Sequence, residues 1–143
     1  IDILPGYSDG YGQRGLAYYR LKDYQSALAN YDKAIEFNPH NATAYSNRGS
    51  LLFELGDYQQ AKLSFEQALK YQPNFVDALS NYASTLGTIG DYQASIHYFQ
   101  KAIALRPNEP NYYQMIGFSY QNMGQMQQAN LYFNKAQQIR QQQ

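Results

Sequence analysis

The 143-residue sequence has no cysteine and no tryptophan, and its formal net charge is zero. Without cysteine, the chain has neither a disulfide framework nor a thiolate metal site, although this leaves the cellular compartment open. The 11 basic residues equal the 11 acidic residues in number, so the chain lacks the positive field that attracts nucleic acid and anionic membranes. We therefore expect neither a nucleic-acid partner nor a membrane partner.

Long apolar runs are missing as well. No stretch approaches the roughly 18 apolar residues that a membrane-spanning helix requires. The first ten residues, IDILPGYSDG, lack the basic start and the long apolar core of a signal peptide. We expect a soluble chain that folds as one domain, with its location open and the cytoplasm favoured. Since tryptophan is absent and tyrosine occurs 16 times, tyrosine and phenylalanine must supply the aromatic part of the core.

What the sequence does contain is a repeat of 34 residues. The word LGDYQQA at residues 55–61 returns in altered form as LKDYQSA from Leu21, IGDYQAS from Ile89 and MGQMQQA from Met123. Other positions that follow the same step are Ala27, Ala61, Ser95 and Ala129; Gly15, Gly49, Ala83 and Gly117; Tyr31, Phe65, Phe99 and Phe133; and Pro39, Pro73 and Pro107. A period of this length predicts paired helices that stack as a solenoid.

Each repeat is divided into two predicted helices, because apolar residues return at steps of three and four. The first helix is predicted to end in a left-handed glycine, at Gly56, Gly90 and Gly124. An aspartate then caps the second helix, at Asp23, Asp57 and Asp91. The mid-helix glycines are predicted to face the small residues of the Ala27 series, so that two antiparallel helices approach closely.

In one repeat the pattern reads Y..RG..L from Tyr45, followed by Ala61, Phe65, Ala68 and Pro73. This pattern resembles the tetratricopeptide repeat, and the resemblance covers about the whole chain. It implies an all-α fold, a right-handed α-solenoid of four helix hairpins whose first helices line a concave groove. The expected repeats are residues 8–41, 42–75, 76–109 and 110–143.

The two ends of the sequence differ from the interior repeats. Residues 1–7 are interpreted as the tail of a truncated preceding repeat, because Pro5 aligns with Pro39; the alternative is a short apolar arm. In the fourth repeat, Gln137 stands where the others have Ile35, Leu69 and Ile103. A polar residue there predicts a C-terminal cap whose outer face meets water.

The titratable residues do not converge on a catalytic site. His40 and His97 are isolated and are interpreted as solvated surface residues. The sequence has no phosphate-binding loop, no Cys/His metal spacing and no nucleophile elbow. We therefore predict that the protein is not an enzyme and that it uses no cofactor and no metal.

The first helices are predicted to present polar side chains to the groove. Asn47 and Asn81 occupy equivalent positions, and an amide that both donates and accepts suits an extended peptide backbone. The alternative is that they are polar residues solvated in a water-filled groove. Superhelical members of the family, such as the repeat domain of the protein O-linked glucosamine transferase, use similar Asn ladders. The predicted peptide-binding residues are Gln13, Ser46, Asn47, Ser50, Ser80, Asn81, Ser84, Asn111, Gln114 and Phe118.

One binding mode known in the family, the recognition of acidic chaperone tails, can be compared with this sequence residue by residue. Family members that hold the acidic C-terminal tails of heat-shock chaperones use a carboxylate clamp of Lys, Asn, Asn, Lys and Arg. The matching positions here are Gly12, Leu16, Asn47, Asp77 and Asn81, and only Asn47 agrees. A shift by one repeat fails as well, so we expect that acidic chaperone tails are not the partner.

The predicted function is a non-catalytic protein–protein interaction scaffold that binds an extended or helical peptide segment of a partner in the groove. One alternative is self-association into a homo-oligomer, through the Ile1 and Ile3 end or through exposed aromatic residues. Concentration-dependent size in solution would favour it. The other alternative is that the chain is the binding arm of a larger protein.

Overall fold

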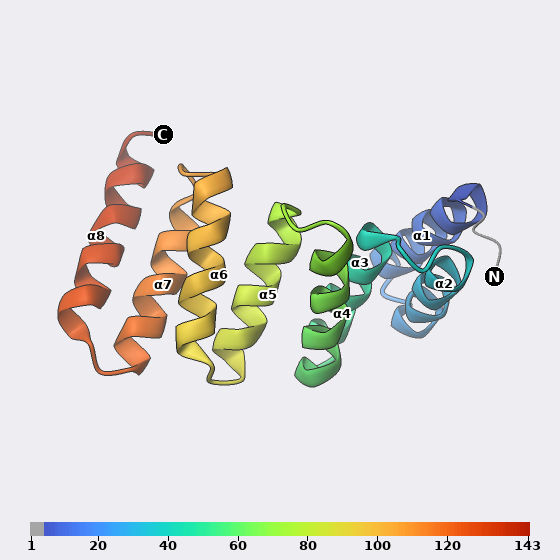
Figure 1. The fold of residues 1–143 in the computed structure, drawn as a ribbon, viewed down its shortest axis with the longest axis horizontal. Helices are drawn as coiled ribbons and strands as arrows, with labels where there is room; N and C mark the ends of the chain where they lie inside the picture. The colour runs from blue at the N-terminus through green and yellow to red at the C-terminus, as the bar shows by residue number, and fades with distance from the viewer. Residues whose placement is uncertain (1–4) are drawn as a thin grey trace. The chain divides into compact units, whose positions relative to one another are not determined.

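The computed structural model describes residues 5–143, and these residues form eight α-helices and no β-strand. The helices, labelled in Figure 1, are α1 (Pro5–Arg20), α2 (Tyr24–Phe37), α3 (Ala42–Glu54), α4 (Tyr58–Tyr71), α5 (Val76–Thr88), α6 (Tyr92–Leu105), α7 (Pro110–Asn122) and α8 (Met126–Gln141). Consecutive helices pack in pairs as hairpins. The predicted all-α class is therefore confirmed.

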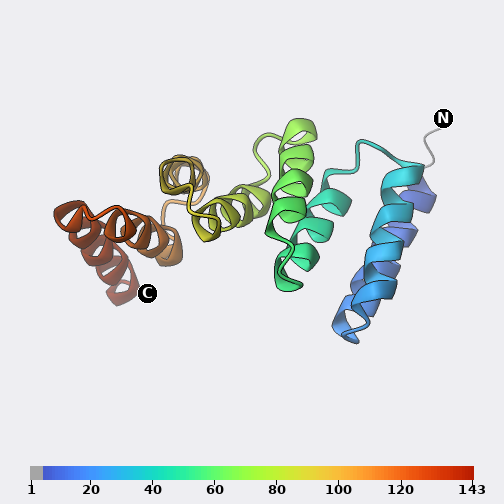
Figure 2. The same cartoon turned by 90° about the horizontal axis from the view of Figure 1, so that it is seen from below.

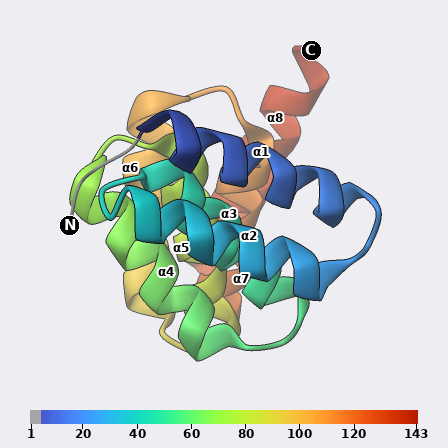
Figure 3. The same cartoon turned by 90° about the vertical axis from the view of Figure 1, so that its right-hand side faces the viewer.

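The chain divides into two compact units, Ile1–Phe75 and Val76–Gln143, each built from two hairpins. In the first unit, α1 packs on α2, and α3 packs on both α2 and α4. Figure 3 shows α1 and α2 running alongside each other, and Figure 2 shows the same for the α3/α4 hairpin. In the second unit, α6 packs on α5 and α7, and α8 packs on α7. The expectation of a single domain overall stays a prediction.

Helix α1 begins earlier than its counterpart in the second hairpin. It starts at Pro5, whereas α3 starts at Ala42, which aligns with Ser8. Proline is favourable in the first turn of a helix, where the missing amide hydrogen would have no intrahelical partner. Residues 5–7 of the predicted tail therefore lie in α1, while residues 1–4 lie outside the described residues. The interpretation of residues 1–7 as a preceding repeat stays a prediction.

The corners inside the hairpins have the predicted backbone. Gly56, Gly90 and Gly124 have φ angles of 83°, 91° and 77°, which confirms their left-handed conformation. The first hairpin has Lys22 at the equivalent position, and its φ angle is 62°. A residue with a Cβ atom pays about 1 kcal/mol or more for this conformation. All four hairpins therefore have a left-handed residue at this turn, including the first, where lysine replaces glycine.

The predicted aspartate caps are confirmed. The side chains of Asp23, Asp57 and Asp91 accept hydrogen bonds from the backbone amides three residues later, at 3.2, 3.3 and 3.3 Å. Each cap satisfies one of the amides that the first turn of a helix leaves without an intrahelical acceptor. In the fourth hairpin the equivalent residue is Gln125, whose side chain makes no such bond to the described residues.

The mid-helix glycines receive an aromatic ring from the second helix of their hairpin. A Cβ atom placed on Gly49 would lie 2.8 Å from the Phe65 ring, and one on Gly117 would lie 2.5 Å from the Phe133 ring. Such distances are shorter than van der Waals contact, so only glycine fits without movement. We expected the small residues Ala61 and Ala129 to face these glycines, but the nearest group is the aromatic ring one helical turn later. The steric requirement for glycine therefore comes from the ring more than from the alanine.

Candidate functional site

The predicted peptide-binding residues all lie on the first helix of a hairpin, but they are divided between the two units. Those of the first unit are Gln13, Ser46, Asn47 and Ser50, on α1 and α3. Those of the second unit are Ser80, Asn81, Ser84, Asn111, Gln114 and Phe118, on α5 and α7. Asn47 and Asn81 thus belong to different units, and their joint action on one ligand stays a prediction.

In the first unit, the predicted residues differ in how much surface they offer. Gln13 is exposed, and Asn47 and Ser50 are half-buried. Ser46 is only 4% exposed, so it contributes little surface to a ligand. Asn47 therefore remains the better placed hydrogen-bonding side chain of α3.

Side-chain bonds from Tyr19 and Arg48 link the helices of the first unit. The Tyr19 hydroxyl on α1 donates a hydrogen bond to the Glu54 carboxylate on α3. This bond, together with partial burial and the charge of Glu54, raises the pKa of Tyr19 to about 12. On the other side of α3, Arg48 Nε lies 2.7 Å from Asp32 on α2, and its Nη1 donates to Ser64 on α4 at 2.8 Å. These links fix the position of the helix that carries Asn47.

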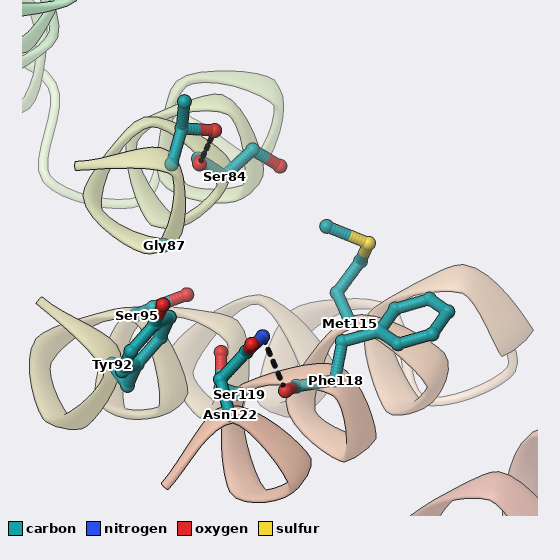
Figure 4. Close-up of a pocket in the computed structure, with 9 residues that line it drawn as sticks. Ser84, Gly87, Tyr92, Ser95, Met115, Phe118, Ser119 and Asn122 are labelled. Carbon is teal, nitrogen blue, oxygen red and sulfur yellow. Dashed lines mark hydrogen bonds between the residues drawn. The ribbon is translucent and has the colours of Figure 1, made fainter. Parts of the chain in front are cut away.

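The second unit contains a recess of about 160 Å³ between α5, α6 and α7 (Figure 4). It is lined by Ser84, Gly87, Thr88, Tyr92, Ser95, Met115, Phe118, Ser119 and Asn122. Met115 and Phe118 lie side by side on α7, and they are 36% and 41% exposed. Exposed apolar side chains that border a recess are typical of binding surfaces. Ser84 and Phe118 are the predicted site residues that the structure brings together here. We call this space the α5–α7 recess.

Three polar side chains around the α5–α7 recess donate hydrogen bonds to backbone carbonyls. The Ser95 hydroxyl donates to the Ala83 carbonyl at 2.8 Å, and the Thr88 hydroxyl donates to the Ser84 carbonyl at 2.9 Å. Asn122 Nδ2 donates to the Phe118 carbonyl at 2.9 Å. A serine or threonine hydroxyl on a helix commonly bonds in this way to a backbone carbonyl. The hydroxyl hydrogens of Ser95 and Thr88 are consequently already engaged within the protein.

Two further predicted residues, Asn111 and Gln114, hold an arginine. Arg140 Nη2 on α8 donates to Asn111 Oδ1 at 3.2 Å and also to Gln114 Oε1. An open depression of about 490 Å³ lies beside this arginine. It is lined by Gln114, Phe118, Phe133, Gln137 and Arg140. We call it the α7–α8 depression. Phe118 borders both the recess and the depression.

Some residues that line the recess and the depression were not predicted, because the prediction considered only the first helix of each hairpin. Tyr92 and Ser95 belong to α6, and Arg140 belongs to α8. The 34-residue repeat could have indicated Arg140, because Arg106 and Asp77 stand one repeat before Arg140 and Asn111. Arg106 Nη1 lies 3.1 Å from Asp77 Oδ1.

Residues 5–143 contain no group of three or more His, Cys, Asp or Glu residues that could hold a metal ion. No helix in the described part is long and apolar enough to cross a membrane.

Three family models match successive parts of the chain. One, described as TPR repeat, matches residues 15–56. Two others, both described as tetratricopeptide repeat, match residues 47–110 and 110–143. No curated protein matches the chain.

Several solved structures share the fold. A crystal structure of MamA has a TM-score of 0.90 and 23% identity, and the alignment covers 96% of this chain and 81% of that one. The structure of MamA 41-end from Desulfovibrio magneticus RS-1 has a TM-score of 0.88 and 25% identity, covering 95% of this chain and 77% of that one.

A third similar structure is the first TPR of Spaghetti (RPAP3) bound to the HSP90 peptide SRMEEVD. It has a TM-score of 0.84 and 18% identity, and the alignment covers 87% of this chain and 98% of that one. A domain of this fold therefore holds an acidic chaperone peptide. This finding partly contradicts our exclusion of acidic chaperone tails, which rested on mismatched clamp positions, and we do not retain the exclusion.

Proposed function

This chain belongs to the tetratricopeptide repeat family, and on that basis we propose that it is a non-catalytic scaffold that binds a peptide segment of a partner protein on its first helices. Proteins of this family generally act as interaction scaffolds rather than as catalysts. The segment is extended or helical, and the side chains proposed to contact it lie on α1 and α3 in the first unit and on α5 and α7 in the second.

The α5–α7 recess is the observation that carries this proposal. It lies beside the exposed side chains of Met115 and Phe118, and its lining combines apolar surface with small polar residues. Peptide sites use the same combination, in which apolar pockets hold side chains and a few polar groups orient the backbone. Asn47 and Asn81, half-buried on α3 and α5, supply amides of the kind that pair with a peptide backbone.

A pull-down with matched variants tests the proposal. The protein and its Asn47→Ala/Asn81→Ala variant are used as baits in an extract of the source cells. A Gln59→Ala/Gln93→Ala variant serves as the control, because it removes two exposed amides from the second helices α4 and α6. Circular dichroism and thermal melting confirm that all three baits fold equally well.

We expect a protein that is captured by the wild type and by the control, and that is lost or strongly reduced with the asparagine variant. Capture that is identical for all three baits would contradict a role for the two asparagines. Recovery of the bait protein alone, together with a size that grows with concentration in light scattering, would favour self-association over binding of a partner.

A further inference from the structure

We propose that the second unit selects partner segments in which a bulky apolar residue and an acidic residue stand two positions apart. The apolar side chain enters the α5–α7 recess, and the acidic group meets Arg140 in the α7–α8 depression, on the other side of Phe118. This inference rests on the proposed function and specifies the chemistry of the partner segment.

The size of the α5–α7 recess suits one large apolar side chain. Its volume is about 160 Å³, and a protein cavity of about 150 Å³ is known to hold benzene. A phenylalanine ring, or a leucine or methionine of similar bulk, therefore fills it. The thioether of Met115 and the ring of Phe118 stand at its edge, where they can contact an incoming ring through sulfur–aromatic and edge-to-face contacts.

The lining of the recess disfavours a charged side chain. All nine residues around it are uncharged, and the polar groups of Ser95, Thr88 and Asn122 each donate a hydrogen bond to a backbone carbonyl. An ion that entered would lose its hydration without gaining a partner of opposite charge. An apolar side chain loses only its contact with water, which is favourable.

The charge of Arg140 is held in place but not neutralised. Its counterpart in the preceding repeat, Arg106, forms an ion pair with Asp77 at 3.1 Å. In the last hairpin, Asn111 replaces that aspartate, so that within residues 5–143 Arg140 is bonded to amide oxygens of Asn111 and Gln114 rather than to a carboxylate. The amides fix the guanidinium and leave its positive charge for a ligand. A carboxylate that contacts it gains a charge-assisted hydrogen bond.

Phe118 connects the two features, because its ring borders both the recess and the depression. In an extended chain, side chains two positions apart point to the same side and lie about 6.6 Å apart. One segment that crosses Phe118 can therefore place an apolar side chain in the recess and, two residues along, an acidic side chain at the depression.

A nuclear magnetic resonance titration tests this selection with defined probes. The ¹⁵N-labelled protein is titrated with an acetylated and amidated peptide of glycine and serine that carries one central Phe-Ser-Asp sequence. Two further probes replace the phenylalanine by serine or the aspartate by asparagine. We expect saturable shifts centred on Ser84, Met115, Phe118 and Arg140, and affinities at least about fivefold weaker for both altered probes.

Matched variants of the protein locate the contacts. We expect Phe118→Ala and Arg140→Gln each to weaken binding of the Phe-Ser-Asp probe by about five- to tenfold. Leu131→Ala and Lys135→Gln, which alter exposed residues of α8 outside both features, should bind like the wild type. Spectra of the free variants show whether each one folds.

Three results of the titrations would overturn the inference. These are equal binding of the three probes, equal binding by Phe118→Ala and its Leu131→Ala control, and shifts at the same residues that grow with protein concentration before any probe is added. The last result would identify a second copy of the chain as the occupant. A partner captured in the pull-down that binds Phe118→Ala as tightly as the wild type would refute this inference and leave the proposed function intact.

Discussion

Lys22 occupies the turn between α1 and α2 with a φ angle of 62°, in the position where the other three hairpins have glycine. Glycine adopts this backbone without the steric cost that a Cβ atom brings. We predict that Lys22→Gly raises the free energy of unfolding by about 0.5–1 kcal/mol, as measured by urea denaturation. Lys22→Ala is the matched control, because it removes the side chain and keeps the Cβ atom. If the alanine variant gains as much as the glycine variant, the conformational explanation is wrong.

Gly49 and Gly117 face aromatic rings at similarly short distances, but the rings differ in freedom. Phe65 opposite Gly49 is fully buried, whereas Phe133 opposite Gly117 is half-buried and borders the open α7–α8 depression. An added methyl group therefore displaces Phe133 more easily than Phe65. After the gain in helix propensity, we predict a net loss of about 1–2 kcal/mol for Gly49→Ala and a smaller one for Gly117→Ala. Equal losses in chemical denaturation would show that burial of the ring does not decide the cost.

At the residue scale, much of the local structure follows from the sequence. Asp57 predicts a helix N-cap, and Gly56 predicts a left-handed turn, because these residue types are strongly preferred at those positions. The importance of Arg140 does not follow from its own identity. It depends on Asn111, 29 residues earlier, standing where the previous repeat has an aspartate, and only the pairing of Arg106 with Asp77 in the structure makes that replacement visible.

At the scale of the helix, the second helices of the hairpins start with unequal caps. Asp57 accepts a hydrogen bond from the Gln60 amide, whereas Gln125 caps α8 with no side-chain bond to the described residues. We predict that Asp57→Ala lowers the free energy of unfolding by about 1 kcal/mol and that Gln125→Asp raises it by about 0.5–1 kcal/mol. Thermal and urea unfolding of the two variants measure both effects. A Gln125→Asp variant no more stable than the wild type would argue against a missing cap at α8.

The contact between α1 and α3 depends on pH through Tyr19. Its hydrogen bond to Glu54 raises the pKa of the Tyr19 hydroxyl from 10.0 to about 12. A pKa that is higher in the folded state stabilises the protein fully below pH 10 and loses that contribution as the pH rises towards 12. Burial also raises the pKa of Tyr31 and Tyr45, with the same sign. The protein should therefore lose stability in this alkaline range.

Urea denaturation at about pH 9 and at about pH 11 measures this loss. We predict that the urea concentration at the unfolding midpoint is lower at the higher pH. Tyr19→Phe should show a smaller decrease, because phenylalanine cannot ionise. Tyr7→Phe, which alters a tyrosine that is 63% exposed, is the control and should follow the wild type. An identical fall in Tyr19→Phe and the wild type would refute the assignment to Tyr19.

At the scale of the whole molecule, the 34-residue period was sufficient to predict the helix hairpins. It repeats the same corner and the same small and aromatic residues, so that each hairpin is specified separately by local packing. The binding surface is less accessible from the sequence. Ser46 was expected at the surface and is 4% exposed, and the α5–α7 recess includes Tyr92 and Ser95 from a second helix. Such features depend on how neighbouring hairpins pack, which a helical pattern alone does not specify.

The claim that the first helices bind a partner segment is tested most directly by calorimetry. The segment recovered from the captured partner is titrated into the wild type, Asn47→Ala/Asn81→Ala and Gln59→Ala/Gln93→Ala. We predict that the asparagine variant binds at least about tenfold more weakly, which is about 1.4 kcal/mol, and that the glutamine variant binds like the wild type. Equal affinity for all three proteins would contradict the account and would place the binding surface away from these two asparagines.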